Sequence, residues 1–251
     1  MVTLFTDIDN TMIYSRRRVT DITNMYLVEC YNNQPLSYMT RRSYNTLNKL
    51  ISGSDIQIVP VTTRTGVQFD RIMFPVFKYE LLCNGGVLRI NGQLDMQWLK
   101  ESQLYAVSAL NILVDAYKLL HDLASGSDFV KNVDELFVFG KFEDSERVYD
   151  LVCNKFDLNL VNVFRQGKKV YILPKEFDKG FAINRFKQRF GVESSISAGD
   201  EVLDFSMADY TDVFLTSNKS CEKGNSKLLT DGVFSDGIFG YIRDTFECSL
   251  Y

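Results

Sequence analysis

A short apolar run at the beginning of the chain ends abruptly in two aspartates. Residues 2–6, Val-Thr-Leu-Phe-Thr, are followed directly by Asp7, and Asp9 comes two residues later, just before Thr11. Two carboxylates add nothing to the packing of a buried strand, whereas open α/β sheets bind ligands outside the carboxyl ends of their strands, at a topological switch point. The stretch therefore predicts an interior strand of an α/β sheet that delivers both carboxylates to a ligand site.

The spacing of Asp7 and Asp9 indicates the chemistry of that site. Side chains two residues apart in an extended segment leave the same face, and two carboxylates held together repel each other unless a cation lies between them. Hard oxygen ligands of this kind suit Mg²⁺, and one carboxylate can attack phosphorus while the other transfers a proton. For this stretch alone, the alternative is a strand followed by an ordinary Asp/Asn turn.

Composition narrows the class of protein. The chain has 251 residues, of which 45% are hydrophobic and 24% are charged, and its formal net charge is −4. These values are typical of a globular protein with one large domain, or with a core and a smaller domain. They give no electrostatic indication of a nucleic-acid or membrane partner, and no apolar run approaches the ~18 residues that cross a bilayer.

Cysteine and histidine usage argues against several kinds of site. The cysteines are scattered and form no CxxC pair, which disfavours both a disulfide framework and a zinc site; they are Cys30, Cys83, Cys153, Cys221 and Cys248. A single histidine, His121, leaves little material for a histidine-based centre. Because the chain opens directly into the first strand, without the basic and apolar regions of a signal peptide, we expect a cytoplasmic protein.

The rest of the chain predicts strands that alternate with helices. Thr40 is a suitable N-cap for a helix over residues 41–52, and Asn91-Gly92 is a strong turn signal within a hairpin over residues 87–98. Further helices are expected at 101–124, 144–155 and 179–190 and in the tail after 217, and further strands at 56–61, 80–83, 136–139, 158–164, 169–173, 194–198 and 211–215.

The segment from Met12 to Met39 is a long excursion from this pattern. Residues 25–30 and 35–39 predict a β-hairpin, and long excursions of this kind tend to be functional flaps or flexible loops. The segment carries three consecutive arginines, Arg16, Arg17 and Arg18. They form either a solvated basic loop or a contact to an anionic substrate, since the arginine fork suits phosphate and carboxylate groups.

Polar groups recur where predicted strands end. Thr62 follows one strand, Asp200 and Asp204 follow another, and Lys179 begins a helix. The carboxyl ends of parallel strands lie along one edge of a sheet, so we expect these groups to converge with Asp7. Together they supply a nucleophile, an acid/base, acidic metal ligands, and a cation and a hydroxyl for phosphoryl oxygens, which is what phosphoryl transfer requires.

Four motifs, in order, resemble those of the haloacid dehalogenase (HAD) superfamily of phosphohydrolases. Asp7-Ile-Asp9-Asn-Thr11 matches the family's Asp-x-Asp-x-Thr, and Thr62-Thr63-Arg64 matches Thr-Gly-Arg with threonine in place of glycine. Lys179-Gly180 fits the basic third motif, with Lys175 as a weaker candidate, and Gly199-Asp200 to Asp204 completes Gly-Asp-x-x-x-Asp.

This resemblance implies a role for each motif residue. Asp7 would form an aspartyl-phosphate, while Asp9 would protonate the leaving group and later activate water. Mg²⁺ would bind Asp7, the backbone carbonyl of Asp9 and Asp200, with Asp204 in support. Thr62 and Lys179 would hold the phosphoryl group. Further candidates for substrate or phosphate contacts are Thr11, Arg64, Asn84 and Gly85. For Glu201, Asp209 and again Arg64, supporting or merely structural roles are expected rather than direct catalysis.

The unit inserted between the second and third motifs reads as αβαββ and resembles a type II cap. We therefore expect an α/β fold with a Rossmann-like parallel sheet core, residues 1–86 and 174–251, and an inserted α+β cap domain, residues 87–173. Such a cap closes over the site and excludes water. Arg165, Lys168 and Lys169 at its hairpin are either substrate contacts or a solvated tip.

The resemblance to capped sugar phosphatases such as the Cof-like enzymes implies a function. We expect a Mg²⁺-dependent phosphatase that hydrolyses a small phosphorylated metabolite, a phosphosugar, through an aspartyl-phosphate. The alternatives are a phosphomutase of the phosphomannomutase type, which uses the same intermediate, and a non-catalytic binding protein that keeps the fold.

Overall fold

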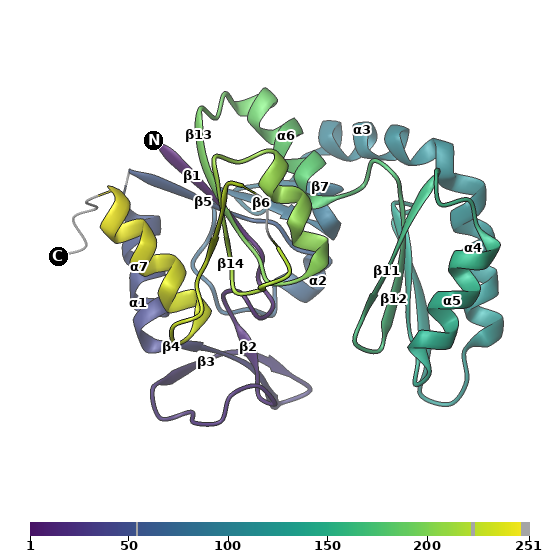
Figure 1. The fold of residues 1–251 in the computed structure, drawn as a ribbon, viewed down its shortest axis with the longest axis horizontal. Coiled ribbons are helices and arrows are strands. Elements are labelled where there is room, and N and C mark those ends of the chain that lie inside the picture. Colours follow the sequence, from purple (N-terminus) through teal and green to yellow (C-terminus); the bar gives the residue numbers. More distant parts are fainter. Residues whose placement is uncertain (54, 222–223, 247–251) are drawn as a thin grey trace. The chain divides into compact units, whose positions relative to one another are not determined.

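The computed structural model describes residues 1–53, 55–221 and 224–246. The chain divides into two compact units: the first comprises Met1–Leu94 and the chain from Lys179 onward, and the second comprises Asp95–Asp178. Cys248 and the end of the expected tail lie outside the described residues. Figure 1 shows the fold of the chain.

The first unit is built on a parallel sheet with the strand order β15-β14-β13-β1-β5. Its strands are β1 Val2–Thr6, β5 Ile56–Pro60, β13 Ser194–Ala198, β14 Val213–Thr216 and β15 Ser226–Leu228. The first strand lies between β13 and β5, paired in parallel with both. Its interior position explains why Leu4 and Phe5 are buried, and the edge strand β15 is an element that the sequence did not predict.

Helices cover this sheet and bring distant parts of the chain together. They are α1 Arg41–Ser52, α2 Gly66–Phe69, α6 Lys179–Phe190 and α7 Phe234–Phe246, with the 3₁₀ segments η1 Cys83–Gly85 and η3 Val202–Asp209. As predicted, Thr40 caps α1 by accepting the Ser43 N–H at 3.0 Å. The helices α1 and α7 lie side by side (Figure 1), joined by a 2.9 Å hydrogen bond from Ser43 to Ser235.

Two small antiparallel sheets complete the first unit. One has the order β2-β4-β3, with β2 Tyr14–Ser15, β3 Met25–Tyr31 and β4 Gln34–Thr40, and it confirms the hairpin predicted in the 12–39 segment. The other joins β6 Tyr79–Leu82, β7 Val87–Ile90 and β8 Gln93–Leu94. This second hairpin ends earlier than the predicted residue 98, because Asp95 accepts the Trp98 N–H and caps the next helix.

The second unit is an antiparallel sheet in the order β11-β12-β10-β9, with α4 and α5 packed on it. The strands are β9 Phe129–Val133, β10 Phe137–Lys141, β11 Val161–Gln166 and β12 Lys169–Pro174, and the helices are α3 Met96–Ala106, the 3₁₀ turn η2 Val107–Ala109, α4 Leu110–Leu123 and α5 Ser145–Lys155. The single helix predicted at 101–124 is therefore two helices joined by a tighter turn. The αβαββ pattern also missed β9, since only Val133 of that strand is buried and its sequence lacks a clear alternation.

The expected fold class is confirmed. A parallel sheet flanked by helices is interrupted, between β8 and α6, by an antiparallel α+β unit. In the described parts of the chain, no helix has the length and apolar character needed to cross a bilayer.

The contact between β1 and α6 gives a first prediction. Phe5 is fully buried and its ring meets Phe186 edge to face at 5.4 Å. The change Phe5→Ala should lower the free energy of unfolding by about 3–5 kcal/mol, because it leaves a cavity under the central strand. Urea denaturation measures this loss. Val67→Ala, at a side chain that is 79% exposed, is the control and should stay within about 0.5 kcal/mol of the parent; equal effects of the two changes would contradict the assignment of Phe5 to the core.

Candidate active site

The predicted site residues of the first unit lie at one edge of the parallel sheet. Asp7 follows β1, Thr62 follows β5 and Asp200 follows β13, and β1 pairs in parallel with both of the other strands. The Asp7 N–H donates to the Ala198 carbonyl at 2.9 Å, which continues the ladder up to the site. The chain therefore brings these side chains together because the strands that deliver them are neighbours.

Lys179 lies between Asp7 and Asp204 and forms an ion pair with each of them. This first residue of α6 is only 2% exposed, and its Nζ donates to Asp7 Oδ1 at 2.5 Å and to Asp204 Oδ1 at 2.6 Å. The other oxygen of Asp204 accepts the backbone N–H groups of Asp200 and Glu201, both at 3.0 Å. The lysine thus ties α6 to the ends of β1 and β13.

The electrostatics of the site are strongly negative. Asp7, Asp200 and Asp204 each offer a carboxylate oxygen, and these atoms lie within 4.8 Å of one another. Burial raises the pKa of Asp7 well above its ordinary value, and the charges of Asp204 and Asp9 add to this effect while Lys179 opposes it. Burial also raises the pKa of Asp200 to about 7, and the charges of Asp204 and Glu201 act in the same direction.

This donor set fits Mg²⁺. The ion prefers oxygen ligands and is commonly held by one or two carboxylates together with water and substrate, and the carboxyl groups of Asp7 and Asp200 supply such oxygens. Asp204 already accepts three hydrogen bonds. Its position therefore suits the supporting role that the sequence predicted better than that of a direct ligand.

Two side chains hold Asp200 in place, and Tyr14 in turn holds one of them, Thr11. The predicted contact residue Thr11 is fully buried and donates from Oγ1 to Asp200 Oδ1 at 3.2 Å. The Asn218 side chain donates to the Asp200 carbonyl at 3.0 Å. Tyr14 donates to the Thr11 carbonyl at 3.0 Å and accepts the Ser235 N–H; sequence reasoning gave Tyr14 and Asn218 no role, because neither belongs to a motif.

Asp9 is paired with Arg64. Arg64 donates to both oxygens of Asp9, each at 2.7 Å. The same guanidinium donates to the fully buried Glu29 at 2.8 and 3.0 Å. Burial by itself lowers the pKa of Arg64, but its hydrogen bonds and ion pairs with Asp9 and Glu29 raise it above its ordinary value.

The loop after β6 is held against Thr62. The Asn84 N–H donates to the Thr62 carbonyl at 2.8 Å, and the Cys83 N–H donates to the Arg64 carbonyl at 2.9 Å. Cys83, Asn84 and Gly85 all have positive φ angles, of 54°, 58° and 86°. Glycine adopts such angles freely, but at Cys83 and Asn84 they are strained, and strained backbone persists only where its surroundings fix it and clusters at functional sites.

Other basic candidates from the sequence have local partners. Arg16 donates to the Val19 carbonyl at 2.8 Å, and the charge of Arg18 lowers the pKa of Asp200 against the larger effect of burial. Lys175, the weaker candidate for the third motif, belongs to the second unit and donates to the Leu158 carbonyl at 3.1 Å. Lys168, also of the second unit, forms an ion pair with Glu143.

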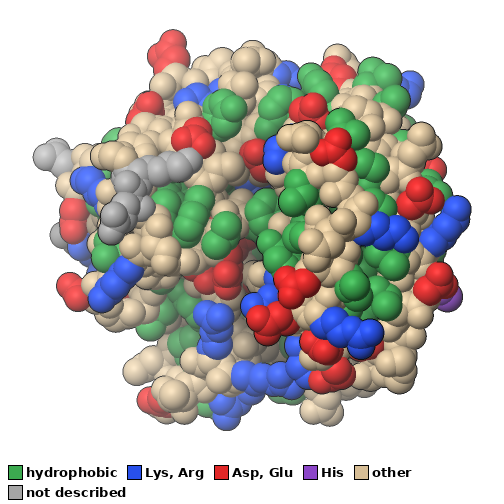
Figure 2. All heavy atoms as spheres, turned by 45° about the vertical axis from the view of Figure 1, so that its right-hand side comes forward, with side chains coloured by type: hydrophobic (Ala, Val, Ile, Leu, Met, Phe, Trp, Pro, Cys, Tyr) green, Lys and Arg blue, Asp and Glu red, His purple; other side chains and the backbone are tan. Residues whose placement is uncertain are grey.

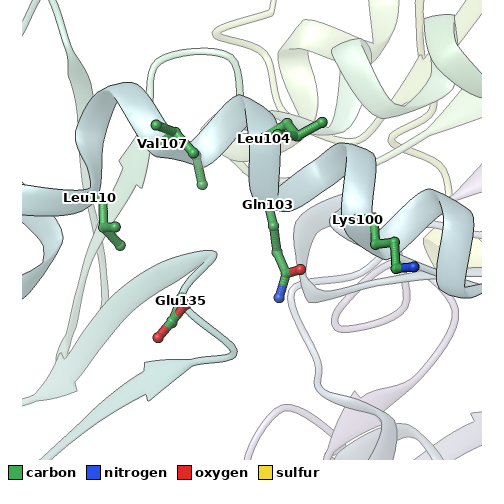
Figure 3. A pocket seen from close by; sticks show the side chains of 7 residues that line it. Lys100, Gln103, Leu104, Val107, Leu110 and Glu135 are labelled. Carbon is green, nitrogen blue, oxygen red and sulfur yellow. The ribbon is translucent and has the colours of Figure 1, made fainter.

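The second unit has a hollow of its own, with a volume of about 460 Å³. It is lined by Lys100, Gln103, Leu104, Ala106, Val107, Leu110 and Glu135. Figure 3 shows Gln103 and Leu110 on the side of the helices where Glu135 lies. This lining is mainly aliphatic, and Glu135 is its one acidic side chain among the described residues.

Comparison with solved structures places this geometry in a known fold. The sucrose-phosphatase from Synechocystis sp. PCC6803, solved with sucrose and phosphate, is 12% identical, with 98% of each chain covered and a TM-score of 0.66. A trehalose-6-phosphate phosphatase related protein is 15% identical, with 98% of each chain covered and a TM-score of 0.60. The chain has the HAD fold. The resemblance expected from the four motifs is thus confirmed at the level of the fold.

A third solved structure, a sugar phosphatase of HAD subclass IIB, is 15% identical over 98% of this chain and 99% of its own, with a TM-score of 0.56. Comparison of the sequence with protein-family models finds no match. Comparison with curated proteins also finds no match. The HAD fold is therefore recognised here from the structure and from the four motifs.

Gly199 gives a prediction for this site. A Cβ at this position would lie 2.3 Å from Asp204 Cβ and 2.7 Å from its Oδ2, and Asp204 cannot yield because both of its oxygens are hydrogen-bonded. Gly199→Ala should cost about 1–3 kcal/mol of stability, as overpacked sites do, and should weaken Mg²⁺ binding in a calorimetric titration.

Gly240 provides the matched control. It lies inside α7, and an added Cβ would meet nothing within 4 Å. Gly240→Ala should raise stability by about 0.5–1 kcal/mol, because alanine loses less backbone entropy in a helix than glycine does, and it should leave Mg²⁺ binding unchanged. Unaltered Mg²⁺ binding in Gly199→Ala would refute the fit of Asp204 to the metal site.

Proposed function

We propose that this protein is a Mg²⁺-dependent phosphatase that hydrolyses a small phosphomonoester, a phosphosugar, through an aspartyl-phosphate on Asp7. The observation that carries the proposal is the buried Lys179 bridging Asp7 and Asp204 at the strand edge. A charge cluster of this kind is expensive to bury, so its presence favours a working site over a retired one.

In the first step Asp7 acts as the nucleophile. One carboxylate oxygen of Asp7 forms a bond to phosphorus while the bond from phosphorus to the leaving oxygen breaks, and Asp9 gives a proton to that oxygen. Lys179 and Thr62 hold the phosphoryl oxygens. The Thr62 Oγ1 accepts the Arg64 N–H at 3.2 Å, which leaves the hydroxyl proton of Thr62 to donate to phosphate.

In the second step water releases the phosphate. Asp9 takes a proton from a water molecule, whose oxygen bonds to phosphorus as the bond from phosphorus to Asp7 breaks. Inorganic phosphate leaves and both aspartates return to their starting state. Asp7, the Asp9 carbonyl and Asp200 would hold Mg²⁺, with Asp204 in support. When bound, the ion supplies positive charge against the phosphoryl oxygens.

The solved structures with this fold support the proposed substrate class. They include a sucrose-phosphatase, a protein related to trehalose-6-phosphate phosphatase and a sugar phosphatase. On the face of the molecule in Figure 2, acidic and basic side chains are interspersed rather than gathered by sign. This mixture of charges gives no indication, in that view, of the extended basic surface that nucleic-acid binding requires.

A substrate panel tests the proposal. Phosphate release from sugar phosphates and other small phosphomonoesters should require Mg²⁺ and should stop with chelator. Asp7→Asn should reduce it to background while the protein stays folded, because the change removes the nucleophile with little change in volume and Asp204 still pairs with Lys179. Asp115→Asn, at a side chain that is 64% exposed, is the control and should retain full activity.

The products separate the alternatives. Free phosphate identifies a phosphatase, whereas an isomerised monoester without phosphate release identifies a phosphomutase. Full Mg²⁺-dependent activity in Asp7→Asn would overturn the assignment of the nucleophile. Silence of the parent protein on the whole panel, with Mg²⁺ still bound, would favour the non-catalytic alternative.

A further inference from the structure

We propose that Glu29, on the inserted hairpin, is a positioning residue that holds Arg64 and through it orients the Asp9 carboxylate for proton transfer. The inference rests on the proposed function, since it concerns the acid/base of that reaction. It assigns a purpose to the 12–39 segment, which none of the four motifs covers.

Arg64 uses its whole guanidinium as a bridge. Nε and Nη2 donate to the two oxygens of Asp9, both at 2.7 Å, while Nη1 and Nη2 donate to the two oxygens of Glu29, at 2.8 and 3.0 Å. Nη1 also donates to the Gln68 carbonyl at 3.2 Å. Two fork-shaped contacts of this kind fix both the distance and the plane of each carboxylate.

Exposure falls along this chain of three side chains, from 44% for Asp9 to 11% for Arg64 and 0% for Glu29. The exposed end is the residue that has to meet the leaving group. The other end, Glu29, lies in the interior. There it accepts hydrogen bonds from Ser37 at 2.7 Å and from Arg71 at 3.2 Å. A carboxylate buried to this extent is tolerated only because these partners satisfy it.

An irregularity in the hairpin turns the Glu29 side chain toward the interior. Between Leu27 and Cys30 the register of β3 against β4 shifts, and the consecutive residues Val28 and Glu29 are both buried, which breaks the alternation of a regular strand. Bulges re-aim side chains in this way next to active sites. On its other edge β3 contacts the loop that follows α2, where the Met73 N–H donates to the Val28 carbonyl at 2.7 Å.

The choice of leaving group separates a positioning role from a merely structural one. Phenyl phosphate needs a proton on its leaving oxygen, whereas 2,4-dinitrophenyl phosphate expels a stable anion and needs none. The ratio kcat/KM reports the reaction up to formation of the aspartyl-phosphate. A misplaced general acid therefore lowers kcat/KM for the first ester selectively, while general damage to the site lowers both.

Glu29→Gln should reduce kcat/KM for phenyl phosphate at least about tenfold, a part of the 10²–10⁴ that general acids contribute, and should change kcat/KM for 2,4-dinitrophenyl phosphate little. In an Asp9→Asn background the same substitution should cause no further loss of kcat/KM for phenyl phosphate, because the effect of a residue that acts through Asp9 does not add to the loss of Asp9.

Glu80→Gln is the control. This buried glutamate faces Arg89 at 3.5 Å in the same unit, and the change should alter neither ester.

If Glu29→Gln does not fold, Ser37→Ala replaces it. That change keeps all charges and removes one hydrogen bond from Glu29, so it should give the same selectivity with a smaller loss. Equal losses on both esters, or a full additional loss in the Asp9→Asn background, would overturn the positioning role. A parent protein inactive on both esters and on the sugar-phosphate panel would overturn the proposed function instead.

Discussion

The buried ion cluster around Lys179 is the interaction on which the first unit depends. An ammonium group that is 2% exposed is stable only with charged partners, and Asp7 and Asp204 contact it at 2.5 and 2.6 Å. Removing one partner from such a cluster leaves an uncompensated buried charge, which costs far more than an exposed ion pair does. The cluster therefore makes α6, β1 and the loop after β13 fold as one arrangement.

The same cluster is electrostatically unbalanced. Asp7, Asp200 and Asp204 gather around a single lysine, and burial raises the pKa of both Asp7 and Asp200. Such a site lowers the stability of the free protein and favours the binding of a cation, which is the exchange of stability for function seen at many active sites. Glycine at position 199 belongs to this arrangement, because Asp204 fills the space that a larger side chain would need.

A second chain of charges runs from the surface inward, from Asp9 through Arg64 to Glu29. It joins the end of β1 to the loop after β5 and to the inserted hairpin. The lysine cluster and the arginine bridge thus hold the two aspartates of one motif in different ways. Asp7 is buried against a cation, while Asp9 is held at the boundary with solvent.

The sequence by itself determined the elements whose signals are local. The strand before Asp7, the Thr40 cap and the Asn91-Gly92 turn could be predicted because each depends on residues within a few positions. The convergence of Asp7, Thr62 and Asp200 could also be predicted, because parallel strands present their carboxyl ends along one edge.

Only the tertiary structure decided which charged side chains pair with each other and which strands lie at the edges of the sheets. Glu29 and Arg64 are 35 residues apart in sequence. The sequence around Glu29 predicts a strand, but it does not predict the bulge that turns this side chain toward an arginine in the loop after β5. The break at residues 107–109 and the edge strand β9 likewise depend on packing within the second unit rather than on periodicity. Ion pairs between distant residues and the pairing of an edge strand depend on neighbours that meet only once the chain has folded.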